Sequence, residues 1–153
     1  MAASTGEFIS TLNNLIETCK DGENGFRESA EGVQDPSLRS VFTEYQQQRS
    51  QFATELQQQV AKLGKAPEDS GSVVAAMHRG WINLKSAVTG KDDLAILEEA
   101  ERGEDSAVKN YKQALLEDIP ADLKSLIQTQ YSGVQKAHDQ IKALRDARRA
   151  GRS

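Results

Sequence analysis

The amino-acid sequence predicts an all-α four-helix bundle, and three observations support that prediction. Residues that favour helices, such as Ala, Leu, Glu, Gln and Lys, are abundant, whereas the chain contains only 3 Pro and 4 Phe. Apolar residues recur at alternating steps of three and four, which is the spacing of one helix face. Caps and helix breakers interrupt this periodicity at a few positions. A chain of 153 residues is long enough to bury one core, so we expect a single domain.

Two helices are predicted in the first part of the chain. Ser4 and Glu7 have the spacing of a capping box, so we expect the first helix to begin there and to run to about Val33. Asp35, followed by proline, provides an N-cap and a first helical position, and Gly64 ends the second helix. The short connection between the two helices makes them an antiparallel pair.

Two further helices are predicted after a long connection. Asp92 caps the third helix, and a breaker at 118–120 separates it from the fourth. The connection, residues 65–91, contains a short helix of its own, which Ser72 begins and Gly90 ends. The apolar face of this short helix comprises Val74, Met77, Trp81, Leu84 and Val88.

The long connection decides the predicted topology. It can carry the chain along the whole bundle, so the third helix can begin at the end where the first helix finished. This arrangement is a ferritin-like antiparallel four-helix bundle with one long crossover. An up-and-down bundle with a docked fifth helix is the alternative. We expect one domain over residues 1–147 and a basic, flexible tail over residues 148–153.

Polar residues interrupt the inward face of every long helix. In the first helix, Glu23 follows Cys19 and precedes Phe26 on the same face. In the crossover topology, the polar positions of the four helices lie at depths that agree to within one or two helical turns. A buried charge is costly unless it is paired or bound to a metal ion, so this layer requires a cause. Its members are Glu23, Gln48, Arg49, Glu101, Glu104 and His138.

Five stretches of the chain resemble a known family. They are CKDGENGFRESAE, QQQRSQFATELQ, GSVVAAMHRGWINLKSAVTG, ILEEAERGEDSAVKNY and QKAHDQIKALRD, and they represent nearly the whole chain. The chain is similar to an uncharacterised bacterial family of small ferritin-like four-helix-bundle proteins, known as a domain of unknown function. The resemblance implies the fold, but it implies no biochemical activity.

A metal site is one explanation of the polar layer. Di-iron ferritin-like proteins place one Glu on each of two helices and a Glu-x-x-His on each of the other two. Glu23 and Glu101 fit the single glutamates, and His138 fits one histidine. Gln135 and Arg49 stand where further ligands are expected, so too few ligands remain for a di-metal centre. Three or four O/N donors can still hold one Fe, Mn or Zn ion. The candidate ligands are Glu23, Glu101, Glu104 and His138.

An ionic core is the other explanation. Arg49 is the expected neighbour of Glu23 across the first two helices, and arginine suits buried carboxylates because it can bind both oxygens. His138 is then a core histidine that is hydrogen-bonded to Glu101, and Cys19 is a small core residue. Under this hypothesis the core polar network comprises Glu23, Gln48, Arg49, Glu101 and His138.

These explanations lead to two hypotheses about function. The first is a degenerate ferritin-like bundle that is not catalytic, has a binding or stress-associated structural role, and gives no certain indication of a cofactor. The second is a metal-binding protein with iron/oxygen or peroxide chemistry in the bundle core. That chemistry needs a metal, because these side chains alone are poor redox groups. An Arg49 side chain that points into the core favours the first hypothesis, and one that points to solvent favours the second.

Composition limits the expected partners and location. The net charge of −4 argues against general nucleic-acid binding, which relies on Lys and Arg. No apolar run approaches the roughly 20 residues that span a bilayer, so we expect no membrane insertion. The sequence shows no signal peptide, and a single cysteine cannot form an internal disulfide. We therefore expect a cytoplasmic protein that can form homo-oligomers through the outer faces of its helices.

Overall fold

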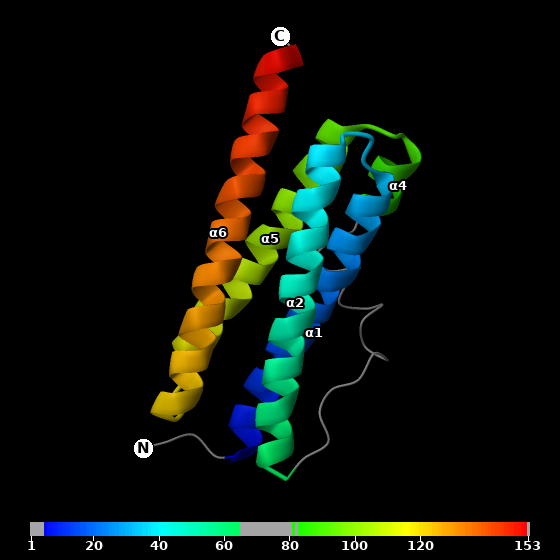
Figure 1. Cartoon of the computed structure of the whole chain (residues 1–153). Coiled ribbons are helices and arrows are strands. Elements are labelled where there is room, and N and C mark those ends of the chain that lie inside the picture. The colour runs from blue at the N-terminus through cyan, green and yellow to red at the C-terminus, as the bar shows by residue number, and fades with distance from the viewer. Residues whose placement is uncertain (1–4, 65–80, 82, 153) are drawn as a thin grey trace.

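The computed structural model describes residues 5–64, 81 and 83–152, and it has no strand in these ranges. Four long helices form the bundle, and a short helix lies in the connection between the second and the third (Figure 1). The helices are α1 (Thr5–Gly32), α2 (Pro36–Lys62), α4 (Leu84–Thr89), α5 (Asp93–Leu115) and α6 (Ala121–Arg152). The prediction of an all-α four-helix bundle is confirmed.

The helix ends follow from local chemistry that the sequence displays. The Asp35 carboxylate accepts a hydrogen bond from the backbone N–H of Ser37 at 2.9 Å, and proline occupies the first position of α2. At the start of α5, the Asp92 carboxylate accepts a hydrogen bond from the N–H of Leu94 at 3.0 Å. Gly64, which follows the C-cap residue Leu63 of α2, has a φ of 79°, a left-handed conformation that glycine adopts without strain. The predicted beginnings of α2 and α5 are therefore confirmed.

The long crossover is confirmed by contacts at one end of the bundle. The Asp93 carboxylate accepts hydrogen bonds from the backbone N–H groups of Gln34 and Asp35, at 2.9 and 3.0 Å. The start of α5 therefore lies beside the end of α1, and Figure 1 shows α5 running away from this end and α6 returning to it. An up-and-down bundle would begin α5 at the opposite end, so that alternative is wrong.

Trp81 attaches the described end of the crossover to the bundle. Its ring is buried and packs edge-on against Phe26, with the ring centroids 5.1 Å apart. Gly25 on α1 and Gly103 on α5 leave space for this ring, because a Cβ atom at either position would lie 2.4 Å from a Trp81 atom. The predicted beginning of the crossover helix at Ser72 lies outside the described residues. The prediction of one continuous helix through Trp81 to Gly90 is wrong, because Trp81 is not helical and α4 begins only at Leu84.

The core consists of two apolar clusters, one in each half of the bundle. The first includes Phe26, Phe42, Leu97 and Ile141. The second includes Ile16, Leu56, Tyr111 and Ile127. Two buried charged residues, Arg49 on α2 and Glu104 on α5, separate the two clusters along their helices. The middle of the bundle is therefore polar, while both halves are apolar.

The last helix is longer than the sequence pattern predicted. α6 continues to Arg152, through most of the segment 148–153 that was predicted to be a flexible tail. Arg148 pairs with Asp35 at 2.8 Å, so the final turns of α6 are connected to the link between α1 and α2. Basic side chains also suit this end of a helix, because its dipole is negative there.

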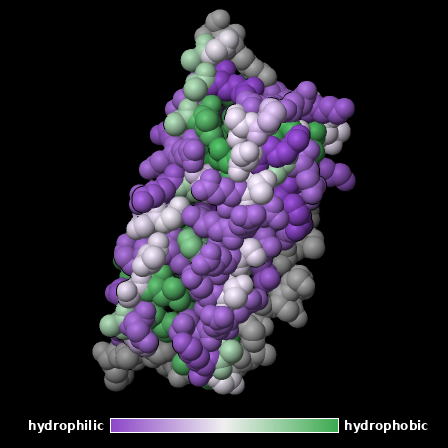
Figure 2. Space-filling view, in the orientation of Figure 1, coloured by the Kyte–Doolittle hydropathy of each residue, from purple (hydrophilic) through white to green (hydrophobic). Residues whose placement is uncertain are grey.

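The surface shown in Figure 2 is mainly hydrophilic, and polar side chains separate its apolar patches. Among the described residues, the large apolar side chain that is exposed is that of Leu116, in the connection between α5 and α6. Within the described ranges, none of the helices has both the length and the apolar character needed to cross a membrane.

Candidate functional site

A buried ion pair joins α2 and α5 in the middle of the bundle. Arg49 Nη1 donates to Glu104 Oε2 at 2.6 Å, and Nη2 donates to Oε1 at 2.5 Å, so the contact is bidentate. Each of the two side chains is only 1% exposed. Both charges are therefore removed from water, and each depends on the other for compensation.

The surroundings of Arg49 explain how a guanidinium fits in the core. Gly22 on α1 leaves the space, since a Cβ atom there would lie 3.1 Å from Arg49 Nη1. The guanidinium stands 5.2 Å from the centroid of the Phe26 ring, and Arg49 Nε donates to Gln48 Oε1 at 3.2 Å. Burial opposes the charge of Arg49, but the Glu104 carboxylate outweighs burial and raises the pKa of Arg49 above its ordinary value. The pair is therefore ionic.

A chain of hydrogen-bonded side chains runs from Cys19 through Tyr111 and Gln130 to Glu55. The Cys19 thiol and the Tyr111 hydroxyl are 3.0 Å apart. The Tyr111 hydroxyl donates to Gln130 Oε1 at 2.7 Å, and Gln130 Nε2 donates to Glu55 at 2.9 Å. Burial raises the pKa of Cys19 to about 11, and it raises the pKa of Tyr111 well above its ordinary value. Both groups are therefore neutral near pH 7, and the prediction that Cys19 is a core residue is confirmed.

The donors of this layer do not fit an ordinary di-metal centre. Both oxygens of Glu104 are bonded to the guanidinium. A metal ion at Glu104 would have to displace the Arg49 guanidinium. Asp21 lines a cavity beside Glu104, but the side chains of Cys19, Tyr111 and Gln130 offer only neutral donors. Fe, Mn and Zn ions favour carboxylates, imidazoles and thiolates instead of such neutral donors. The cation that this layer holds is the guanidinium of Arg49.

The predicted partner of Arg49 is wrong, because Glu104 rather than Glu23 binds the guanidinium. Steps of three and four place Glu23 on the inward face of α1, but Gly22 is the residue of this turn that lies against Arg49. The side chain of Glu23 is half-buried. Gly22 has no side chain, so a pattern of apolar side chains does not identify it as inward-facing. The pattern therefore indicated its neighbour Glu23.

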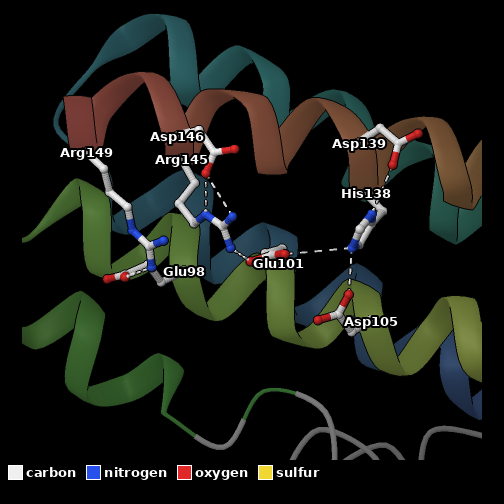
Figure 3. Close-up of polar contacts among 8 residues, drawn as sticks. All are labelled: Glu98, Glu101, Asp105, His138, Asp139, Arg145, Asp146 and Arg149. Atoms are coloured by element: carbon white, nitrogen blue, oxygen red, sulfur yellow. Dashed lines mark hydrogen bonds and ion pairs between the residues drawn. The ribbon is translucent and has the colours of Figure 1, made fainter. Parts of the chain in front are cut away.

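The contact between α5 and α6 carries a second set of charged groups, which we call the α5–α6 seam (Figure 3). It comprises Glu98, Glu101 and Asp105 of α5 and His138, Arg145 and Arg149 of α6. The Arg145 guanidinium donates to Glu101, and His138 Nε2 lies 2.6 Å from Asp105 Oδ1. The side chains of Glu101 and His138 are 13% and 17% exposed, so the seam is in partial contact with water.

The structure divides the predicted metal ligands between different places. Glu101 and His138 lie together in the α5–α6 seam, with Glu101 Oε1 3.9 Å from His138 Nε2. Glu104 lies in the core with Arg49. Among the described residues that can ligate a metal ion, Glu101 and His138 form a cluster with Asp105, and this cluster does not include Glu23 or Glu104.

Asp105 is the candidate residue that the sequence pattern did not reveal. It follows Glu101 by four residues, so both carboxylates leave the same face of α5. This spacing could have identified Asp105. Glu104, its neighbour in the sequence, fits the inward face of α5 and was therefore predicted as the ligand instead. Asp105 has a side chain that is 60% exposed, and it approaches His138 from the outside of the seam (Figure 3).

A comparison with protein families classifies the chain. Residues 7–117 match the model of a family described as "Domain of unknown function (DUF2383)". The chain belongs to this family. The DUF2383 description names no biochemical role, and no curated protein matches the chain. The matched range contains both Arg49 and Glu104, and it ends before α6.

A solved structure, that of a Dps1 mutant from Mycobacterium smegmatis, is similar to the DUF2383 chain. The TM-score is 0.76 at 16% sequence identity, and the match covers 94% of this chain and 99% of the other. At this identity the similarity shows the fold alone. The predictions of a ferritin-like fold and of a resemblance to an uncharacterised ferritin-like family are confirmed.

Proposed function

We propose that this DUF2383 protein is a non-catalytic ferritin-like bundle with a binding or stress-associated structural role, and that an ion pair replaces a metal centre in its core. The observation that carries the proposal is the bidentate contact between Arg49 and Glu104, which leaves 1% of each side chain exposed. Arg49 points into the core, as the first of the two functional hypotheses requires.

Charge compensation supports the proposal. A buried carboxylate needs a metal ion or a cationic side chain beside it. The guanidinium of Arg49 keeps its positive charge at every physiological pH, and its two donors match the two oxygens of Glu104. The buried charge of Glu104 is therefore compensated by a group of the protein itself. The neutral hydroxyl of Tyr111 and amide of Gln130 provide further buried hydrogen bonds.

The rival function is metal binding in the core, with iron/oxygen or peroxide chemistry. It requires Fe, Mn or Zn at Glu23, Glu101, Glu104 and His138, and therefore an Arg49 that releases Glu104 and leaves its buried position. Glu101 and His138 would also have to approach from the α5–α6 seam, where they pair with Arg145 and Asp105. Breaking a buried ion pair is strongly unfavourable, and this cost favours the non-catalytic function.

The proposal includes a setting for the protein. We place it in the bacterial cytoplasm, where it associates through the outer faces of its helices with further copies or with another protein. General nucleic-acid binding is not part of the proposal, because a net charge of −4 opposes contact with phosphates.

Metal loading tests the proposal. The variant Asp105→Asn is used beside the natural protein, because Asp105 belongs to the seam cluster and is not a ligand of the rival core site. After incubation with Fe(II), Mn(II) or Zn(II) and desalting, elemental mass spectrometry should find far less than one ion per variant chain. The iron-treated variant should consume peroxide no faster than buffer does. Near-stoichiometric metal with peroxide turnover, both abolished by a further Glu104→Gln change, would overturn the proposal.

A further inference from the structure

We propose that the α5–α6 seam contains a binding site for a single divalent first-row transition-metal ion, formed by Glu101, Asp105 and His138. One ligand atom from each of the three residues lies within 4.8 Å of the other two. The site is separate from the Arg49–Glu104 pair and belongs to the outer side of the contact between two helices. It therefore goes beyond the proposed function, which concerns the core.

The environment of His138 is the strongest argument for a cation. Nε2 lies 2.6 Å from Asp105 Oδ1, and Nδ1 lies 3.2 Å from Asp139 Oδ1, so both ring nitrogens face carboxylate oxygens (Figure 3). A neutral imidazole has one N–H, and carboxylates only accept. A neutral ring therefore leaves one lone pair directed at a carboxylate. A second proton or a metal ion on Nε2 removes this conflict.

The two partners of His138 match the roles of ligand and supporting group. When Nδ1 donates its N–H to Asp139, the lone pair of Nε2 is directed toward Asp105 and Glu101. Metal-binding histidines commonly donate the other N–H to a carboxylate, which fixes the ring and makes the ligating nitrogen more basic. Asp139 can provide this support, because it lies next to His138 on α6 and 73% of its side chain is exposed.

Glu101 is held in a position that leaves one oxygen available. Its Oε2 accepts a hydrogen bond from Arg145, while its Oε1 faces His138 Nε2 at 3.9 Å. Arg145 also pairs with Asp146 at 2.8 Å, so the guanidinium is itself fixed. A metal ion at Oε1 would therefore leave the contact of Glu101 with Arg145 in place.

The distances are compatible with coordination after a small movement. Zinc bonds to nitrogen and oxygen are about 2.0–2.2 Å long, so ligand atoms around one ion are roughly 3.3 Å apart in a tetrahedron. The separations of His138 Nε2 from Asp105 and from Glu101, 2.6 and 3.9 Å, lie on either side of this value. Asp105 is 60% exposed, so its carboxylate can move outward to admit the ion.

The donor set selects the class of ion. One imidazole and two carboxylates suit Zn(II) and its first-row neighbours, whereas Mg(II) favours oxygen donors and octahedral geometry. Water can supply the remaining ligand, because the seam is partly exposed. The proposed occupant is therefore a first-row divalent ion, and Zn(II) is a suitable probe because it is not redox-active.

Calorimetric titration of chelator-treated, dialysed protein with Zn(II) tests the site. We expect one ion per chain, and at least a tenfold loss of affinity in both Asp105→Asn and His138→Ala. Glu98→Gln is the matched control, because Glu98 is a seam carboxylate that pairs with Arg149 outside the cluster. This control should bind Zn(II) as the natural protein does, and Mg(II) at the same concentration should give no heat of binding.

A second readout separates coordination from general attraction to acidic groups. In NMR spectra, Zn(II) bound at the seam should shift the ring resonances of His138 with one-to-one stoichiometry, and Asp105→Asn should weaken this change. Absence of saturable Zn(II) binding, or equal affinity in the natural protein and both variants, would overturn the seam site. Neither result would affect the proposal for the core. That proposal is overturned only if the protein binds a metal ion and this binding depends on Glu104.

Discussion

The Arg49–Glu104 pair and the α5–α6 seam consist of similar charged groups, but they differ in their contact with water. Each partner of the core pair is 1% exposed, whereas Arg149 and Glu98 of the seam are 49% and 41% exposed. A lone charge left in the core has no solvent to compensate it, while a lone charge at the exposed Arg149–Glu98 position is hydrated. The position of an ion pair, rather than its presence, therefore decides its importance for stability.

The two regions also differ in their freedom to rearrange. Arg49 is enclosed by the Phe26 ring, Gly22 and Glu104, so a movement of its guanidinium would disturb three helices. In the seam, Asp105 can change its rotamer in solvent without disturbing the packing. The core region therefore suits a fixed structural role, and the seam suits exchange of a proton or a metal ion.

The largest expected effect is the loss of one partner of the core pair. Glu104→Leu leaves the Arg49 guanidinium buried without a counter-charge, so the free energy of unfolding should fall by about 3–5 kcal/mol. Denaturation by urea, followed by circular dichroism, measures the change. A loss below about 1 kcal/mol, which is typical of an exposed pair, would show that Arg49 reaches water and that the core pair is not closed.

The smallest expected effect is the loss of an exposed seam pair. Glu98→Gln removes the contact with Arg149, and we expect a change of less than about 1 kcal/mol in the same urea experiment. High salt sharpens the comparison, because the Debye length is only about 3 Å at 1 M. The effect of Glu98→Gln should vanish in 1 M NaCl, while that of Glu104→Leu should persist. Equal salt sensitivity of both variants would contradict the difference in burial.

The sequence predicted most of the fold because helix ends and crossover length are local properties. Asp35 and Asp92 cap their helices with side-chain hydrogen bonds, as the residue types indicated. The crossover could be predicted because the connection between α2 and α5 contains enough residues to return along the whole bundle. The end of α6 was harder to predict, because ion pairs such as that of Arg148 with Asp35 depend on the tertiary structure.

The sequence predicted the site less well than the fold. A small error in the predicted rotation of a helix about its axis is enough to replace an inward-facing residue by its neighbour. A buried Arg49 in the middle of the bundle was correctly expected, but Gly22 rather than Glu23 faces the guanidinium, and Glu101 and His138 lie in the seam instead of the core. Glycines inside α1 and α5, such as Gly22 and Gly103, mark the close approach of a large side chain. Partners on α5 could not be chosen from spacing alone, since Glu101 and Glu104 lie only one turn apart.

A double-mutant cycle on Arg49→Met and Glu104→Leu is the most direct test of the ion pair as the centre of the core. Each single change leaves a buried group without its partner, whereas the double change replaces both with apolar side chains of similar volume. We predict that the double variant is more stable than either single variant and close to the natural protein. Losses that simply add in the double variant would show that the two residues are not coupled, and would contradict a core held by this pair.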